Sequence, residues 1–193
     1  MTARQPPCDN AGSFLRPAMS IPSASPRFQK VQYQLRVGVS ADGPAIDGWL
    51  NARAPLPVPE ARARRLSLDA LLEQGGHGIC LLGGCTSAVR EGGDSLEADA
   101  ALACLMPVTL VHSLALGGRV AIAAEWWPPA ADAAGWLDAA SQLLADWCRA
   151  HGIRHIRLAP GLVADTSGPP EGFARDADGL WLRSLIPTPK RLG

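Results

Sequence analysis

The sequence has little of several residue types on which common functions depend. Its 193 residues include one tyrosine, Tyr33, and two lysines, Lys30 and Lys190. No Tyr-x-x-x-Lys segment exists, which excludes the proton relay in which a lysine lowers the pKa of a nearby phenol. An excess of one charge is also missing, because 18 Lys and Arg balance 18 Asp and Glu. We therefore expect no nucleic-acid or anionic-membrane partner, since both require a basic face.

Long apolar runs are missing as well. Each is interrupted by charge or glycine within about a dozen residues, short of the ~20 that cross a bilayer. The five cysteines include no Cys-x-x-Cys pair and lie mostly in apolar stretches, and the four histidines have no metal-ligand spacing with them. These features are typical of reduced, buried thiols and argue against a metal site. We expect a soluble, cytoplasmic protein without a metal.

The composition of residues 1–30 differs from that of the rest of the chain. Residues 1–30 are rich in Pro, Ser and Arg and lack the apolar core of a secretory signal. Such a segment is typical of a disordered lead-in. Residues 31–193 have the length of one domain with a sizeable core.

Hydrophobic patterning predicts that strands and helices alternate along this domain. A period of two at 35–39 and continuous apolar runs at 78–82, 120–124 and 153–158 predict strands. Caps and helical spacing predict helices at 45–52, from Ser67 or Asp69 to 75, at 94–117 with a kink at Pro107, and from about 131 to 152. This alternation implies an α/β fold, a Rossmann-like three-layer domain with a mostly parallel sheet of reduced strand number.

The segment from His151 to Val163, HGIRHIRLAPGLV, contains a helix end, a buried strand and a Pro-Gly turn at the strand's carboxyl end. Ligands bind at that end of the strands in open α/β sheets. The segment resembles the end of the sixth strand in short-chain dehydrogenase/reductases, and residues 78–163 are similar to strands four to six of that family. GPPEGF at 168–173 and IPTPKRLG at 186–193 are similar to the substrate loop of pteridine and dihydromonapterin reductases.

The resemblance implies a site for NADP(H) and for a flat substrate. Glu125 falls where pteridine reductases carry an aspartate, which implies a catalytic carboxylate; otherwise it is a solvated residue at a strand end. Trp126 and Trp127 either stack on a pterin or pack at the rim of the sheet. The resemblance further places the substrate beside Pro160 and Gly161, and the cofactor beside Gly83, Gly84, Cys85, Pro160, Gly161 and Leu162.

Departures from the family pattern bear on the implied activity. The family's tyrosine and lysine fall at Ala130 and Ala134, which hold no transferable proton. No Gly-rich phosphate loop precedes them. Residues 35–52 match either the family's second strand and helix, with the first strand absent, or the first strand and helix, with the second and third units absent.

Two functional hypotheses follow from the resemblance. The first is a catalytically impaired protein of pteridine-reductase type, shortened at both ends, that acts by association in a homo- or hetero-oligomer or by weak ligand binding. The alternative is an active NADPH-dependent oxidoreductase in which Glu125 and a water replace the tyrosine. It would reduce a pterin or a similar flat carbonyl or imine. A truncated gene product without a selected role is the third alternative.

Overall fold

The computed structural model describes residues 34–73, 76–85, 101–163 and 168–187, apart from the side chains of Cys85 and Ala101. Two predictions concern other parts of the chain. The lead-in at 1–30 and the beginning of the helix predicted at 94–117 lie outside the described residues.

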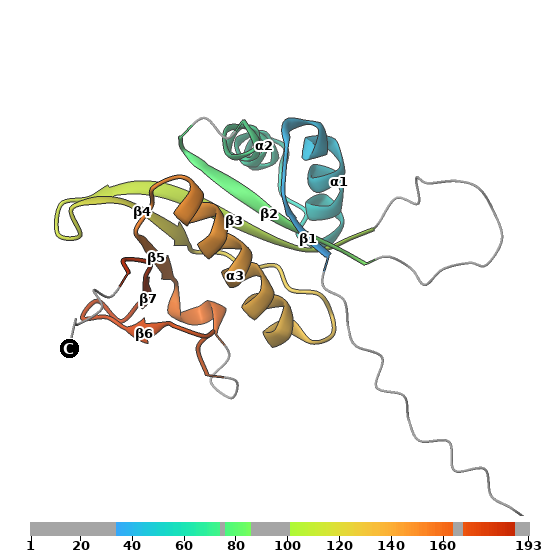
Figure 1. Cartoon of the computed structure of the whole chain (residues 1–193). Coiled ribbons are helices and arrows are strands. Elements are labelled where there is room, and N and C mark those ends of the chain that lie inside the picture. The colour runs from blue at the N-terminus through green and yellow to red at the C-terminus, as the bar shows by residue number, and fades with distance from the viewer. Residues whose placement is uncertain (1–33, 74–75, 86–100, 164–167, 188–193) are drawn as a thin grey trace, which may run out of the picture. The chain divides into compact units, whose positions relative to one another are not determined.

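The described residues form one sheet in the strand order β1-β2-β3-β4-β5-β7-β6 (Figure 1). Its strands are β1 (Gln34–Val37), β2 (Gly78–Cys85), β3 (Ala101–Ser113), β4 (Gly118–Ala123), β5 (His155–Leu158), β6 (Ala174–Arg175) and β7 (Trp181–Ser184). Within this sheet β4 and β5 run parallel, and every other neighbouring pair is antiparallel. The sheet is therefore mixed and mostly antiparallel.

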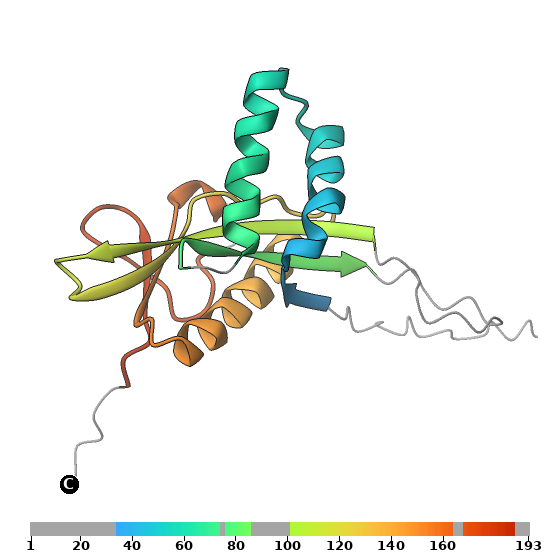
Figure 2. The ribbon, with the colours of Figure 1, turned by 90° about the horizontal axis from the view of Figure 1, so that it is seen from above.

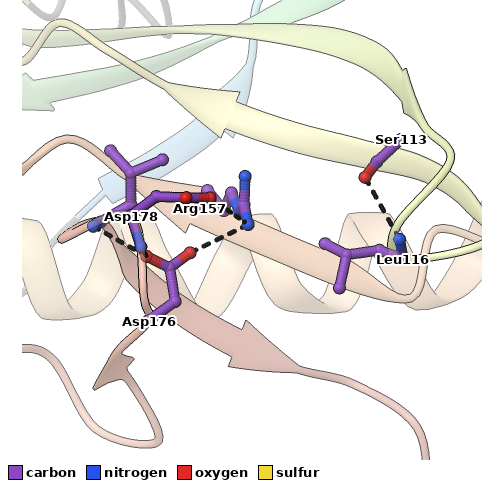
Figure 3. Close-up of polar contacts among 6 residues, drawn as sticks. Ser113, Leu116, Arg157, Asp176 and Asp178 are labelled. Atoms are coloured by element: carbon purple, nitrogen blue, oxygen red, sulfur yellow. Dashed lines mark hydrogen bonds and ion pairs between the residues drawn. The ribbon is translucent and has the colours of Figure 1, made fainter.

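The prediction of a mostly parallel, Rossmann-like sheet is wrong. Where a helix was predicted at 94–117, β3 is a strand that pairs with β2 on one side and β4 on the other. A hairpin instead of a crossover helix joins β3 to β4, and a hairpin makes neighbouring strands antiparallel. Gly117, with a φ of 67°, lies in the turn of this hairpin and does not end a helix. Ser113 Oγ accepts a hydrogen bond of 3.2 Å from the Leu116 N–H across the same turn (Figure 3).

Helices cover both faces of the sheet: α1 (Gly43–Arg53) and α2 (Val58–Leu72) lie on one face, and α3 (Ala133–Ala150) lies on the other (Figure 2). The predicted helices at 45–52 and 131–152 are confirmed, with small differences at their ends. Beyond α3 the chain turns at Gly152, which has a φ of 70°, and Ile153 N–H donates to the Cys148 carbonyl at 2.9 Å. No helix in the described part of the chain is long and apolar enough to cross a membrane.

The core explains why the apolar strands could be recognised. Along β2, Ile79 and Leu81 turn into the cluster beneath α3, whereas Cys80 and Leu82 turn into the cluster beneath α1 and α2. A strand that is covered on both faces carries a continuous apolar run. The strands predicted at 78–82, 120–124 and 153–158 are β2, β4 and β5.

One arginine connects the hairpin of β6 and β7 to β5. Arg157 Nη2 on β5 contacts Asp176 Oδ2 at 3.0 Å and Asp178 Oδ2 at 3.2 Å (Figure 3). Asp176 Oδ1 in turn accepts hydrogen bonds of 3.0 Å from the N–H groups of Asp178 and Leu180. The turn between β6 and β7 is thereby held beside β5, whose second edge pairs with β7.

Candidate functional site

A β-bulge follows β4. Ile122 pairs with Thr109 of β3, and farther along Trp127 pairs with Leu105 through two backbone hydrogen bonds of 2.9 and 3.1 Å. The chain from 122 to 127 advances five residues while β3 advances four, from 105 to 109. One extra residue is therefore inserted after β4, which is the definition of a bulge.

Pro107 explains the position of the bulge. The Leu105 N–H and C=O groups both bond to Trp127, on the side of β3 that faces β4. The Leu110 N–H bonds to the His77 carbonyl, on the side that faces β2. Because N–H groups alternate between the two neighbours of an antiparallel strand, position 107 faces the segment after β4. Proline has no N–H to offer there, and within sheets it is tolerated at bulges.

The bulge contains main-chain donors that have no partner in the described part of the chain. Within the described residues, the N–H groups of Ala124, Glu125 and Trp126 donate no hydrogen bond. The last bond between the two parallel strands runs from Ala159 N–H to the Ala123 carbonyl, at 2.9 Å. Beyond it the chain after β4 stays beside β3, while the chain after β5 turns into a short 3₁₀ helix at Pro160–Leu162. The two strands part at this point.

A pocket of about 650 Å³ lies where the strands part. Its volume is within the range of small-molecule sites. Four segments contribute its lining: 124–128 after β4, Ala133, Ala134, Leu137 and Asp138 of α3, Ala159 and 161–163 after β5, and 168–170.

Glu125 is an acidic residue of the bulge and of the pocket lining. Its carboxylate Oε2 accepts a hydrogen bond of 3.4 Å from the Trp127 indole N–H. Trp127 in turn packs edge-to-face against Trp49 of α1, with ring centroids 6.4 Å apart, and the Arg53 guanidinium lies 3.9 Å from the Trp49 ring centroid. The orientation of Glu125 therefore depends on contacts that reach through Trp127 to α1.

The first turn of α3 contributes a second polar feature. Asp132 caps the helix with a φ of 54°, and its Oδ1 accepts a hydrogen bond of 3.2 Å from the Gly135 N–H. In the described part of the chain the N–H groups of Ala133 and Ala134, which line the pocket, donate no hydrogen bond. The charged residues of the lining are Glu125 and Asp138, and among the described residues no Lys, Arg or His lines it. The pocket is acidic.

The structure brings together most of the residues predicted as a site. Glu125, Trp126, Trp127, Gly161 and Leu162 all line the pocket, and Pro160 lies between two lining residues. Their predicted roles in binding and catalysis stay predictions.

The predicted cofactor residues on β2 lie elsewhere. Gly83 and Gly84 belong to β2, where Cys85 is the last residue, and none of the three is in the pocket lining. Gly83 packs under Trp136 of α3, because a Cβ at Gly83 would lie 2.5 Å from that ring. Gly83 therefore serves packing, and both glycines lie within a strand and not in a phosphate loop.

The contribution of α3 to the pocket was not predicted from the sequence. Ala133, Ala134, Leu137 and Asp138 were assigned to a helix, but not to a site. One feature of the sequence could have indicated it: the helix was predicted to start a few residues after the strand at 120–124, whose carboxyl end carried the predicted site.

No protein-family model matches this sequence, and no curated protein matches it. Solved structures of acetyltransferases do match its fold. The GNAT family N-acetyltransferase YhbS from Escherichia coli, solved in complex with CoA, matches with a TM-score of 0.53 at 14% identity, over 81% of this chain and 83% of that chain. The chain has the GNAT fold. An N-acetyltransferase from Staphylococcus aureus Mu50 matches with a TM-score of 0.51 at 7% identity, over 81% of this chain and 100% of that chain.

The GNAT fold overturns the resemblance to short-chain dehydrogenase/reductases of pteridine-reductase type. It also overturns both hypotheses built on it, the impaired reductase and the active oxidoreductase, together with the predicted NADP(H) cofactor. The segment from 120 to 163 suggested the wrong family because β4, α3 and β5 form a β-α-β unit with parallel strands. This unit is shared by unrelated folds. The strands around this unit differ from a Rossmann sheet in direction.

Proposed function

We propose that this chain transfers an acyl group from a thioester to an amine in the pocket between the ends of β4 and β5. The observation that carries the proposal is the bulge at 124–126, whose unpaired N–H groups belong to residues that line the pocket. The GNAT fold, which the chain shares with N-acetyltransferases, supports the same chemistry.

The bulge supplies what acyl transfer requires of a backbone. When an amine attacks a thioester carbonyl, the carbonyl oxygen gains negative charge in the tetrahedral intermediate. N–H donors held in place before the reaction stabilise that charge without reorganising, and removing one such donor costs about 100-fold or more in rate in well-studied enzymes. The free N–H groups of Ala124, Glu125 and Trp126 are the donors available here.

Glu125 supplies the base. Its carboxylate takes a proton from the nitrogen of the amine, whose lone pair forms the new C–N bond with the carbonyl carbon. The intermediate then collapses, the C–S bond breaks, and the departing sulfur receives the proton that Glu125 took from the nitrogen, which gives a free thiol and restores the carboxylate. The products are an amide and a thiol, and no oxidant or reductant takes part. Trp127 acts as a positioning residue because its indole N–H bonds to the Glu125 carboxylate.

The thioester is a substrate in this proposal, and CoA is the carrier found in the Escherichia coli structure. An uncharged acyl-thioester arm fits the lining, which combines apolar side chains with free main-chain N–H groups. Among the described residues the charged members of the lining, Glu125 and Asp138, are both acidic and offer no counter-ion to the phosphate groups of CoA. The transfer itself needs no contact with the phosphates.

The experiment that tests the proposal is a thiol-release assay with the full-length chain. It combines acetylpantetheine or acetyl-CoA with a panel of primary amines and confirms the amide product by mass spectrometry. We expect amine-dependent thiol release, and we expect Glu125→Gln to slow it by about 100-fold or more, because the base is lost.

The matched control is Glu60→Gln, which makes the same change at an exposed residue in the first turn of α2. This variant should react at the wild-type rate. If no donor and amine pair gives release above the uncatalysed rate, or if Glu125→Gln reacts like Glu60→Gln, the proposed chemistry is wrong.

A further inference from the structure

Part of the pocket lining is continuous with the core of the molecule. Leu137 of α3 and Val163 after β5 line the pocket and belong to the core cluster beneath α3, with exposed fractions of 5% and 7%. Trp126 of the bulge and Leu162 of the 3₁₀ helix also line the pocket, and they pack half-buried against the same cluster. We call these four residues the apolar wall: Trp126, Leu137, Leu162 and Val163.

The apolar wall is supported from behind. Ala123 and Leu158, the last residues of β4 and β5, belong to the same core cluster and are completely buried. Packed cores deform little, since their side chains are held at the density of an organic crystal. The wall is therefore in place before a ligand binds.

The bulge determines which part of an acyl donor reaches the wall. A thioester carbonyl bound by the free N–H groups of the bulge lies beside Trp126, because this residue belongs to both the bulge and the wall. The carbonyl carbon carries two substituents, the sulfur of the carrier arm and the acyl chain. A pantetheine arm contains amide and hydroxyl groups, whose burial against apolar side chains is unfavourable unless new hydrogen bonds replace those to water.

The acyl chain is the substituent that suits the wall. An alkyl chain has no polar group to desolvate, and it gains free energy when apolar side chains cover it. An acetyl group presents only one methyl group, so that most of the wall stays in contact with water. Each further methylene that is buried strengthens binding by about three- to four-fold.

We infer that the preferred donor of this pocket is a thioester of a straight-chain acyl group longer than acetyl, whose chain packs against the apolar wall. The inference rests on the proposed acyl transfer and names the class of acyl group that is transferred. Because an acyl chain can bind without reacting, binding tests the inference separately from the transfer.

The test is isothermal titration of the full-length chain with two unreactive ketones, S-acetonylpantetheine and S-2-oxoheptylpantetheine. A methylene separates the sulfur from the carbonyl in both, so that an amine cannot displace the carrier, and the ketones mimic the acetyl and the hexanoyl donor. We expect the longer ketone to bind at least about ten-fold more tightly, because its additional methylenes are buried. Its heat capacity of binding should also be more negative, which is the signature of apolar burial.

The variant Leu162→Asn tests whether the gain arises at the apolar wall. Asparagine is close to leucine in size, but an alkyl chain that covers its amide deprives the amide of hydrogen bonds to water. We expect the advantage of the longer ketone to shrink to about three-fold or less in this variant. Leu162→Met conserves volume and apolar character and should keep the wild-type ratio of affinities. Leu66→Asn, the same change at a leucine of α2 that is 72% exposed, is the matched control and should alter neither affinity.

Three outcomes overturn the inference: equal or weaker binding of the longer ketone, no binding of either ketone, or an unchanged ratio of affinities in Leu162→Asn. Each does so even if acetylpantetheine releases thiol with an amine, in which case the proposed transfer stands. If the longer ketone binds more tightly as expected but no acylpantetheine releases thiol with any amine, the apolar site stands and the proposed transfer is wrong.

Discussion

Gly83 lets β2 and α3 approach each other closely. A Cβ at this position would lie 2.3 Å from the Cys104 sulfur on β3 and 2.5 Å from the Trp136 ring on α3. Both neighbours are buried side chains in contact with the sheet, so neither is the free end of a flexible surface residue. At the scale of single residues, this glycine sets the distance between the sheet and the helix whose first turn lines the pocket.

Gly83→Ala should destabilise the protein by about 1 to 3 kcal/mol, because the added methyl group overpacks a filled core. Gly48→Ala is the matched control, since no atom lies within 4 Å of a Cβ placed at Gly48 in the interior of α1. That variant should gain roughly 0.5 to 1 kcal/mol from the higher helix propensity of alanine. Urea unfolding of both variants gives the comparison, and equal effects would contradict the packing role of Gly83.

At the scale of elements, an ion pair joins β1 to the beginning of α1. Arg36 on β1 donates two hydrogen bonds of 2.6 Å to the carboxylate of Asp42, the residue directly before α1, and this carboxylate also accepts from the Val39 N–H at 2.8 Å. The hydrogen bond from Arg36 is the main cause that lowers the pKa of Asp42 below its ordinary 3.8. A lowered folded-state pKa means that this link stabilises the fold above pH 3.8 and is lost as the pH falls through the folded value.

Asp42→Asn should therefore be less stable than the wild type at neutral pH, by up to about 1 kcal/mol given the exposure of Arg36. The difference should shrink as the pH falls below 3.8, where the wild-type carboxylate also becomes neutral. Unfolding curves of both proteins across this range provide the measurement. A difference that stays constant with pH would show that the charge of Asp42 is not what stabilises the link.

Among the helices and strands, some could be predicted from the sequence and others could not. The period of apolar residues located α3, because its buried positions recur on one helical face, and the runs in β2, β4 and β5 are apolar because both faces are covered. Such runs carry no information about strand direction, so the antiparallel order was not predictable from them. β3 was mistaken for a helix because Pro107 and Gly117 suit a kinked helix with a glycine end as well as a bulge and a hairpin turn. Pairing with distant strands decides between the two.

At the scale of the whole molecule, the site is defined by where strands end. Glu125, Trp126, Gly161 and Leu162 were assigned to one site through the resemblance, and they do lie together because they follow two parallel strands, which end at the same edge of a sheet. That relation holds in both the Rossmann and the GNAT fold, which is why the location was found although the fold and the chemistry were wrong. The bulge and the cap of α3 depend on tertiary contacts with β3 and with the loop before α3, and residue patterns do not reveal them.

The central claim, that the amides of the bulge bind the carbonyl of an acyl donor, is tested most directly by NMR. A titration of the ¹⁵N-labelled full-length chain with S-acetonylpantetheine, a non-hydrolysable ketone analogue of acetylpantetheine, follows every backbone amide. The account predicts that the largest shifts occur at Ala124, Glu125 and Trp126, with smaller shifts at Ala133 and Ala134. Shifts confined to residues outside the pocket, or none at the bulge at saturating ligand, would contradict it.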